Sequence, residues 1–266
     1  MIKLLALPST FTGEEKSLLL RTYKIGMIAR AAATFGITDI GIYYDPDPLF
    51  ESHGLGRFIV KVLKYINTPP YLRKIAFGKD DSLRYVGYTE PLKTPHHLDR
   101  EYKVQYRYAY VLERVGNKLR VNDGREVLWV KIGEGFKEGN RIVVIDTERR
   151  VTIDRRKLPI YFGYYVFYYN KGLLELLKSL KKRGFFIIGT SRYGKDIRKT
   201  ELKLCDKEKI AIFFGSPFRG LREMLGGDVS LFDVFLNFIP EQNVKTIRTE
   251  EAVFYTLSIL RYLNII

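Results

Sequence analysis

The sequence predicts an α/β protein whose parallel sheet is interrupted by a small all-β barrel. Three observations lead to this prediction. The chain opens with apolar runs that alternate with helix-like segments, which is typical of strands joined by crossover helices. Helical periodicity then disappears between about residues 90 and 171, where short alternating runs lie between turn signals. From residue 160 onward, buried strands and helices resume.

The first part of the chain predicts two strands and two helices in alternation. Residues 2–7 are mostly apolar and predict a first buried strand. Residues 14–35 carry apolar side chains at three- and four-residue spacing, and Gly36 is placed to end that helix. Residues 37–44 and 55–66 repeat the pattern of strand and helix.

The middle of the chain predicts a barrel of five short strands. We expect them at residues 102–112, 118–121, 127–132, 141–146 and 151–153. Turn signals such as Asn122-Asp123-Gly124 separate these runs. Short strands at this density are typical of an OB-like barrel. We therefore predict one α/β domain in two pieces, residues 1–88 and 161–266, with residues 89–160 as the inserted barrel.

Five aromatic side chains lie among the basic residues of the predicted barrel. They are Tyr102, Tyr106, Tyr108, Tyr110 and Trp129. Residues 93–158 hold 16 lysines or arginines against 10 aspartates or glutamates, a net charge of +6. Aromatic rings and cations together can hold single-stranded nucleic acid. The alternative is that the rings form the barrel core, and both hypotheses can hold on opposite strand faces.

The last part of the chain predicts a ligand-binding crevice. Its strands are expected at residues 160–169, 185–188, 210–214 and 231–236, and its helices at 172–182 and from Thr249 to about Tyr262. The loops 189–194, 215–220 and 237–249 follow three of these strands and are rich in glycine, small hydroxyl side chains or proline. Because the carboxyl ends of parallel strands meet at one edge, these loops predict a ligand site there. The alternative is that they are only tight turns.

The composition points to a polyanionic partner and a reducing compartment. The formal net charge is +15, which favours an interaction with nucleic acid. Cys205 is the only cysteine, so no disulfide can form within the chain, and we expect a cytoplasmic location. The sequence shows neither a signal peptide at its start nor an apolar run long enough for a membrane span.

Common catalytic and metal-binding signatures are missing from the sequence. It has no Walker phosphate loop, no dinucleotide-binding glycine pattern and no cysteine pair for zinc. His96 and His97 are adjacent and have no third histidine nearby, so we expect no metal site. RNA contact or a local capping role is the favoured hypothesis for these two histidines.

Six motifs span nearly the whole chain. They are GMIARAAATFGITDIGIYYD (26–45), PPYLRKIAF (69–77), EPLKTPHHL (90–98), GTSRYG (189–194), FFGSPFRGL (213–221) and FLNFIPEQNVKTIRTEEA (235–252). In these motifs and in their order, the chain resembles the SPOUT superfamily of S-adenosylmethionine-dependent RNA methyltransferases. More narrowly, it resembles the archaeal and eukaryotic putative RNA methyltransferase family with an inserted OB-like barrel.

The resemblance implies a trefoil knot near the C-terminus that holds S-adenosylmethionine, and a homodimer with its site near the subunit interface. By motif match it implies a cofactor pocket lined by Thr190, Gly215, Ser216, Gly220, Asn237, Ile239, Pro240, Gln242, Ile247, Thr249 and Ala252. The family usually has PGQG in the third loop, whereas this chain has Pro240-Glu241-Gln242-Asn243. Glu241 restricts the backbone there, while Asn243 tolerates a positive φ and can replace glycine.

The implied reaction is methylation of a ribose 2′-OH or a base nitrogen of structured RNA, with ribosomal RNA favoured over transfer RNA. Arg30 is the first catalytic candidate, because a guanidinium among small apolar residues could hold a phosphate or stabilise an oxyanion. Its alternative is an ion pair with Asp45 or Glu250. Arg192 is the second candidate and could instead be a solvated loop charge. Glu250 is expected to bind the cofactor's amino end or to serve only as a helix-start charge.

Contacts to RNA are expected at basic, aromatic and histidine side chains outside the crevice. These candidates are Arg57, His96, His97, Tyr106, Arg107 and Lys195. The alternative function is a non-enzymatic RNA-binding or ribosome-assembly protein that keeps the knot as a scaffold. Binding of S-adenosylmethionine distinguishes the two functions, because a scaffold has no need of the cofactor.

Overall fold

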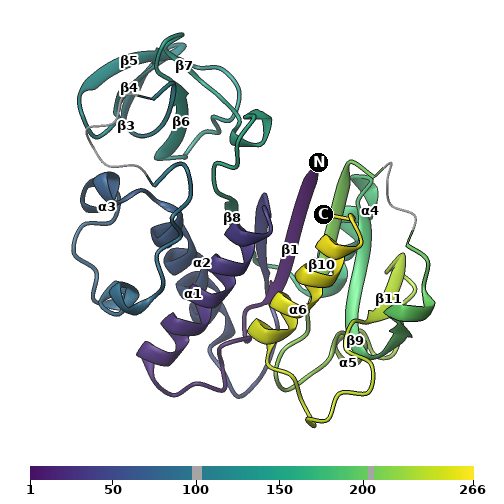
Figure 1. Ribbon diagram of the computed structural model, residues 1–266. Coiled ribbons are helices and arrows are strands. Elements are labelled where there is room, and N and C mark those ends of the chain that lie inside the picture. Colours follow the sequence, from purple (N-terminus) through teal and green to yellow (C-terminus); the bar gives the residue numbers. More distant parts are fainter. Residues whose placement is uncertain (98–103, 203–206) are drawn as a thin grey trace. The chain divides into compact units, whose positions relative to one another are not determined.

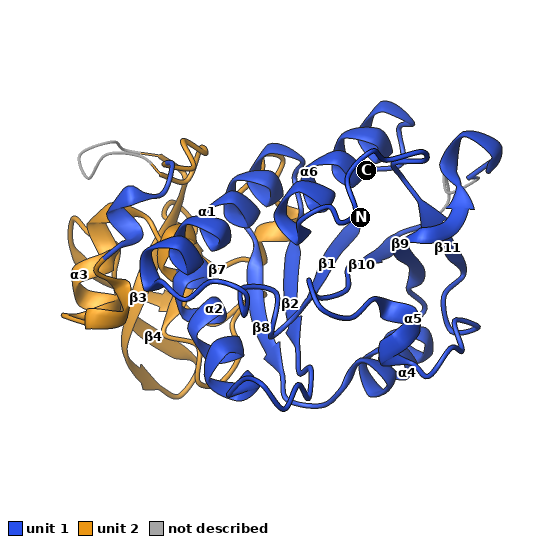
Figure 2. Cartoon of the chain, turned by 90° about the horizontal axis from the view of Figure 1, so that it is seen from below, with its two compact units in different colours: residues 1–64, 85–90, 164–266 blue, residues 65–84, 91–163 orange. Residues whose placement is uncertain are grey.

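The computed structural model describes residues 1–97, 104–202 and 207–266 (Figure 1). Tyr102 and Cys205 therefore lie outside the described residues. The chain divides into two compact units (Figure 2). The first comprises residues 1–64, 85–90 and 164–266, and the second comprises residues 65–84 and 91–163. The domain limits 1–88, 89–160 and 161–266 stay a prediction.

The first unit is built on a six-stranded sheet in which all neighbouring strands are parallel. The strand order is β11-β9-β10-β1-β2-β8. The strands are β1 (Ile2–Pro8), β2 (Asp39–Tyr43), β8 (Tyr165–Tyr169), β9 (Phe186–Asp196), β10 (Lys209–Phe213) and β11 (Val234–Asn237). The predicted α/β class with a parallel sheet is thus confirmed, while the knot stays a prediction.

Helices cover both faces of this sheet. They are α1 (Leu18–Thr34), α2 (Ser52–Asn67), α4 (Leu173–Lys182), α5 (Leu221–Met224) and α6 (Thr249–Tyr262). The leucines of α4 pack with Leu4, Ala6 and Phe213 of the central strands in one buried cluster. Figure 2 shows α1 and α6 side by side on the opposite face. Because both faces are covered, β1 and β10 are mostly apolar, with a lysine only near the start of each.

The second unit contains a closed five-stranded barrel, as predicted. Its strands are β3 (Tyr106–Val115), β4 (Lys118–Asn122), β5 (Val127–Lys131), β6 (Ile142–Asp146) and β7 (Val151–Thr152). They follow the order β3-β4-β5-β7-β6, with β5 and β7 parallel. Alternating side chains such as Leu119, Val121 and Val130 fill the barrel interior.

Helix α3 (Pro70–Phe77) belongs to the second unit as well. Its Leu72 joins Tyr108, Val144 and Phe162 in a buried cluster beside the barrel. The remaining short elements are 3-10 turns at Asp81–Leu83, Val86–Tyr88, Arg155–Lys157 and Ile197–Lys199.

Two local expectations in the last part of the chain were wrong. The predicted loop 189–194 is strand in the structure, because β9 continues to Asp196 and pairs with β11 across an irregularity in register. Thr249 is the first residue of α6 and does not cap it. The N-cap is Arg248, whose backbone N–H donates to Glu251 Oε2 at 2.9 Å.

Candidate functional site

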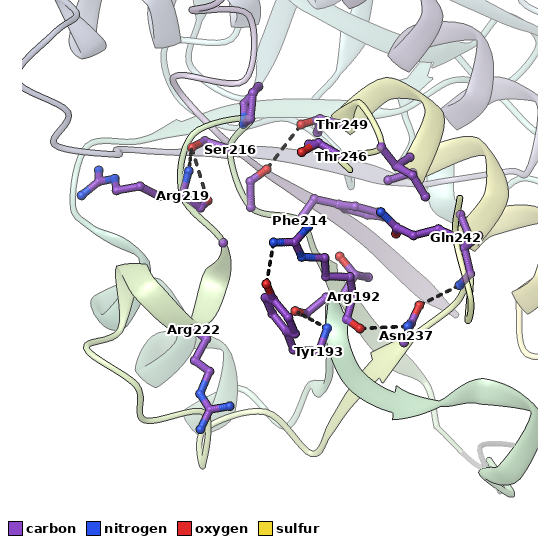
Figure 3. A pocket seen from close by; sticks show the side chains of 18 of the residues that line it. Arg192, Tyr193, Phe214, Ser216, Arg219, Arg222, Asn237, Gln242, Thr246 and Thr249 are labelled. Atoms are coloured by element: carbon purple, nitrogen blue, oxygen red, sulfur yellow. Dashed lines mark hydrogen bonds between the residues drawn. The ribbon is translucent and has the colours of Figure 1, made fainter. Parts of the chain in front are cut away.

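A cavity of about 560 Å³ lies at the carboxyl ends of β9, β10 and β11 (Figure 3). Its volume lies in the range of small-molecule sites. Residues from the end of β9, the loop after β10, the loop after β11 and the start of α6 line it. The lining includes the predicted residues Thr190, Arg192, Gly215, Ser216, Gly220, Asn237, Ile239, Gln242, Ile247, Thr249 and Ala252. Pro240 is not among the lining residues.

The loop after β10 is held by its own hydrogen bonds. Ser216 Oγ accepts from the backbone N–H of Arg219 at 3.0 Å, and the N–H of Ser216 donates to the Arg219 carbonyl at 2.9 Å. A Cβ on Gly215 would lie 2.9 Å from that carbonyl oxygen, so only glycine fits this tight turn. Thr190 Oγ1 donates to the Phe213 carbonyl at 2.8 Å and ties β9 to the end of β10.

Asn237 connects the first and third segments of the cavity wall. Its Nδ2 donates to the Arg192 carbonyl at 2.9 Å, and its Oδ1 accepts from the N–H of Ile239 at 2.9 Å (Figure 3). Thr249 Oγ1 donates to the Gly215 carbonyl at 3.4 Å, which links α6 to the loop after β10. The three segments are therefore cross-connected and preorganised around the cavity.

Close backbone approach at Gly194 explains why β9 and β11 can pair here. A Cβ on Gly194 would lie 2.4 Å from the carbonyl carbon of Leu236 and 2.7 Å from the nitrogen of Asn237. Real Cβ atoms do not approach backbone atoms so closely, so any larger residue would push the two strands apart.

The departure from the family's PGQG loop falls on a strained backbone position. Glu241 has a φ of 61°, in the left-handed region that favours glycine. Glu241 thus adopts a glycine-like conformation at the first glycine position, whereas Asn243, at the second, is not among the described residues with positive φ. Glu241 Oε1 lies 3.1 Å from Arg198 Nη2, and both side chains are exposed.

Arg192 is the one predicted catalytic residue that lines the cavity. Its Nη1 donates to the Lys245 carbonyl at 2.6 Å, and its guanidinium lies 4.6 Å from the centre of the Tyr193 ring. These contacts hold the exposed guanidinium beside the cavity, and both the catalytic role and the alternative of a solvated loop charge stay predictions. The other charged residues of the lining are Arg219, Arg222, Glu223 and Lys245.

The sequence analysis missed a partner of the cavity wall. Arg219 Nη2 pairs with Asp45 Oδ1, and Thr10 Oγ1 donates to the other oxygen of this carboxylate. Asp45 is only 2% exposed, and burial raises its pKa, although Thr10 and Arg219 oppose that shift. The position of Asp45 directly after β2, at the carboxyl edge of the sheet, was the signal that could have indicated its role.

Glu250 is a buried ion-pair residue outside the cavity lining, in place of the predicted cofactor contact. It is 5% exposed, and its Oε1 lies 3.3 Å from Lys24 Nζ. Lys24 also pairs with Glu14 and, at 2.8 Å, with Glu15. Arg30 is half-buried on α1 and does not line the cavity. The partners suggested for it, Asp45 and Glu250, pair with Arg219 and Lys24.

The RNA-binding candidates divide into exposed and buried side chains. Arg57 and Lys195 are exposed, and Tyr106 is half-buried. Arg107 is 1% exposed, against the expectation of an RNA contact. Its Nε and Nη2 donate to the Asp123 carbonyl at 3.3 and 3.2 Å, and its guanidinium stacks over Tyr71 at 4.6 Å. It therefore stabilises the barrel unit.

The two adjacent histidines share one backbone acceptor. His96 Nε2 and His97 Nε2 lie 3.1 and 3.2 Å from the Asn67 carbonyl oxygen. His96 is 1% exposed and packs between Tyr108 and Phe162, so it is not the expected RNA contact. Burial lowers the pKa of His96 well below its usual value and that of His97 to about 4. These contacts favour a local structural role for both histidines, which was the alternative to RNA contact.

The barrel aromatics divide between buried and exposed positions, and binding of nucleic acid by the exposed ring stays a prediction. Tyr108 is buried, and Tyr106 and Tyr110 pack against the same cluster. Trp129 is 44% exposed on β5.

Two absences follow from the part of the chain that the structure describes. Residues 1–97, 104–202 and 207–266 contain no group of three or more histidine, cysteine, aspartate or glutamate side chains arranged to hold a metal ion. In the same ranges, no helix combines the length and apolar character that a membrane span requires.

Comparison with known proteins identifies the chain's relatives. The sequence model of one family, described as "Putative RNA methyltransferase", matches residues 3–260. An uncharacterized protein of Haloarcula marismortui is 32% identical over 281 residues, which cover 95% of this chain and 96% of that protein. The 28S rRNA (uridine-N(3))-methyltransferase of Drosophila melanogaster is 27% identical over 303 residues, covering 97% of this chain and 61% of the fly protein. The SpoU methyltransferase AviRb of Streptomyces viridochromogenes, solved with AdoMet, has 9% identity and a TM-score of 0.40, covering 98% of this chain and 58% of AviRb.

These findings define the class of protein as an RNA methyltransferase. The chain belongs to the family described as "Putative RNA methyltransferase". The family recognised from the sequence motifs is thus confirmed.

Proposed function

We propose that the protein transfers the methyl group of S-adenosylmethionine to N3 of a uridine in large-subunit ribosomal RNA. Among the acceptors left open by the sequence, the base nitrogen is favoured because the fly relative is named for that reaction and the similarity spans 97% of this chain. The observation that carries the proposal is the cavity that gathers the predicted cofactor residues from three segments at one sheet edge.

The chain's own residues fit the cofactor in two respects. Apolar side chains such as Phe214, Phe238 and Ile247 line the cavity, which suits the flat adenine ring. The cations Arg192 and Lys245 in the same lining suit the carboxylate of the methionine moiety or an RNA phosphate. The cofactor supplies an activated methyl group on a sulfonium sulfur.

In the proposed reaction, the bond from N3 to the methyl carbon forms as the bond from sulfur to that carbon breaks. The products are methylated uridine and the neutral thioether S-adenosylhomocysteine. The N3 proton leaves to water, and the negative charge that its departure develops lies on the uracil oxygens. The guanidinium of Arg192, which lines the cavity and bonds the Lys245 carbonyl, could stabilise this charge.

The proposal includes a homodimer in the cytoplasm. Arg30 keeps a proposed catalytic role only in this context, because it does not line the cavity within one chain. The exposed residues Arg57 and Lys195 remain proposed RNA contacts.

The test combines cofactor binding with identification of the product. Calorimetric titration of S-adenosylmethionine should show binding that Asn237→Ala and Thr249→Ala weaken about tenfold or more, because each removes a link between cavity segments. Glu138→Ala, an exposed change in the barrel unit, serves as the control. Incubation of ribosomal RNA with methyl-deuterated cofactor should then yield labelled N3-methyluridine on nucleoside mass spectrometry. Label on a ribose would refute uridine N3 as the methyl acceptor. Absence of cofactor binding even with RNA present would refute the proposed enzymatic function.

A further inference from the structure

The outer face of β4 and β5 carries a tryptophan surrounded by cations. Strand alternation places Lys118 and Arg120 of β4 and Val127, Trp129 and Lys131 of β5 on the solvent side, and all five are exposed. The intervening residues Leu119, Val121 and Val130 are buried in the barrel core. We call these five exposed residues the Trp129 face.

We propose that the Trp129 face binds a single-stranded segment of the RNA, with one unpaired base stacked on the Trp129 indole. This inference rests on the proposed function, because it assumes an RNA substrate, and it adds where and how the barrel holds that RNA. Base stacking on an aromatic ring contributes substantially to single-strand binding and tolerates any base sequence.

The indole is displayed to solvent at the centre of this face. Trp129 is 44% exposed, although the barrel core beneath it is filled by smaller aliphatic side chains. Arg120 lies directly across from Trp129 in the register of β4 and β5. A base stacked on the indole would therefore have a guanidinium beside it that can reach its phosphate.

Like charges on this face lower the folding stability of the barrel. Lys118 and Lys131 are cross-strand neighbours, and like charges at such positions repel one another. Arg120 Nη1 lies 3.0 Å from Glu113 Oε1, but both side chains are about half exposed, so the pair contributes little and can open at small cost. A polyanion across this face would relieve the lysine repulsion, which supports RNA as the partner.

The turn between β6 and β7 extends the basic surface. The backbone N–H of Lys131 donates to the Arg150 carbonyl at 2.8 Å, which fixes this turn beside the end of β5. Arg149 and Arg150 are exposed there. Cations therefore continue past one end of the face, as the phosphates of an extended strand require.

The experiment uses the single tryptophan of the chain as its own probe. The full-length protein is titrated with a single-stranded RNA of about ten nucleotides, a typical site size for such a barrel, while tryptophan emission and the anisotropy of labelled RNA are both recorded. We expect emission to be quenched in step with binding. Trp129→Ala should weaken binding about tenfold or more, and Trp129→Phe should retain most of the affinity. Leu174→Ala, an exposed change on α4 in the first unit, serves as the control and should change little.

The charge component is tested by salt. Lys118→Ala and Lys131→Ala should each lower the slope of log affinity against log salt by about 0.7. RNA binding without a change in emission, Trp129→Ala with wild-type affinity, or an absence of single-stranded RNA binding would each overturn the inference. Cofactor binding and methylation of ribosomal RNA are measured separately on the same variants, so failure of this inference is distinguishable from failure of the proposed function. Circular dichroism melting confirms that each variant is folded.

Discussion

Acidification should destabilise the unit that contains the barrel, because His96 and His97 are held neutral in the folded state. Both Nε2 atoms point to the Asn67 carbonyl, and His96 Nδ1 is buried without a hydrogen-bond partner. A proton on His96 would therefore place a charge in the interior, close to His97 and Arg155. Protonation should accordingly favour the unfolded state for both residues.

The size of the effect follows from the pKa of His97, which burial lowers from 6.5 to about 4. Between these two values the unfolded state binds more protons, so folding stability falls as the pH falls through this window and the loss is complete below the folded-state pKa. Between pH 7 and pH 5, His97 alone should cost about 2 kcal/mol. His96, whose pKa is lowered well below its usual value, should add to the loss in the same direction.

Urea unfolding followed by circular dichroism at pH 7 and pH 5 measures this effect. Asp45 titrates in the opposite sense, because its raised pKa makes the folded state gain stability as the pH falls. The readout is therefore the difference between the wild type and His97→Gln, in which an amide replaces the donor to Asn67. His97→Gln should lose about 2 kcal/mol of the pH dependence. If His97→Gln keeps the pH dependence of the wild type, the claim that His97 is held neutral in the folded protein is wrong.

Three further perturbations test the site. Gly194→Ala should destabilise the protein by about 1–3 kcal/mol and abolish cofactor binding, because the added Cβ separates β9 from β11. Gly87→Ala, with open space around it, is the control and should leave the melting temperature unchanged. Equal melting temperatures for the two variants would contradict the close approach at Gly194. Glu241→Gly should stabilise by up to about 1 kcal/mol by relieving the left-handed backbone, and a lower melting temperature than that of Glu241→Ala would oppose this. Lys24→Met should cost about 3 kcal/mol in urea unfolding, because it leaves buried carboxylates uncompensated, and Glu250→Gln in the same chain should recover part of that loss. No recovery would mean that the two residues do not interact.

The sequence by itself determined the order of the elements and the position of the crevice. Mostly apolar runs mark β1 and β10 because both sheet faces are covered. Alternating runs mark the barrel because only one face of each strand is buried. The loops at strand ends predicted the cavity because carboxyl ends of parallel strands necessarily meet at one edge. These inferences depend on local periodicity and on the geometry of parallel sheets, which can both be read along the chain.

The tertiary structure alone decided which charged residues face the cavity and which are buried. Arg219 meets Asp45 although 174 positions separate them, and Glu250 meets Lys24 of a distant helix. Arg107 and His96 looked like surface residues in sequence, yet packing against Tyr71 and Phe162 buries them. Residues 189–194 were taken for a loop, because glycine and hydroxyl side chains resemble a turn, but β9 continues through them to Lys195 and Asp196, which pair with β11. In each case the deciding partner is remote in sequence, and local composition contains no record of it.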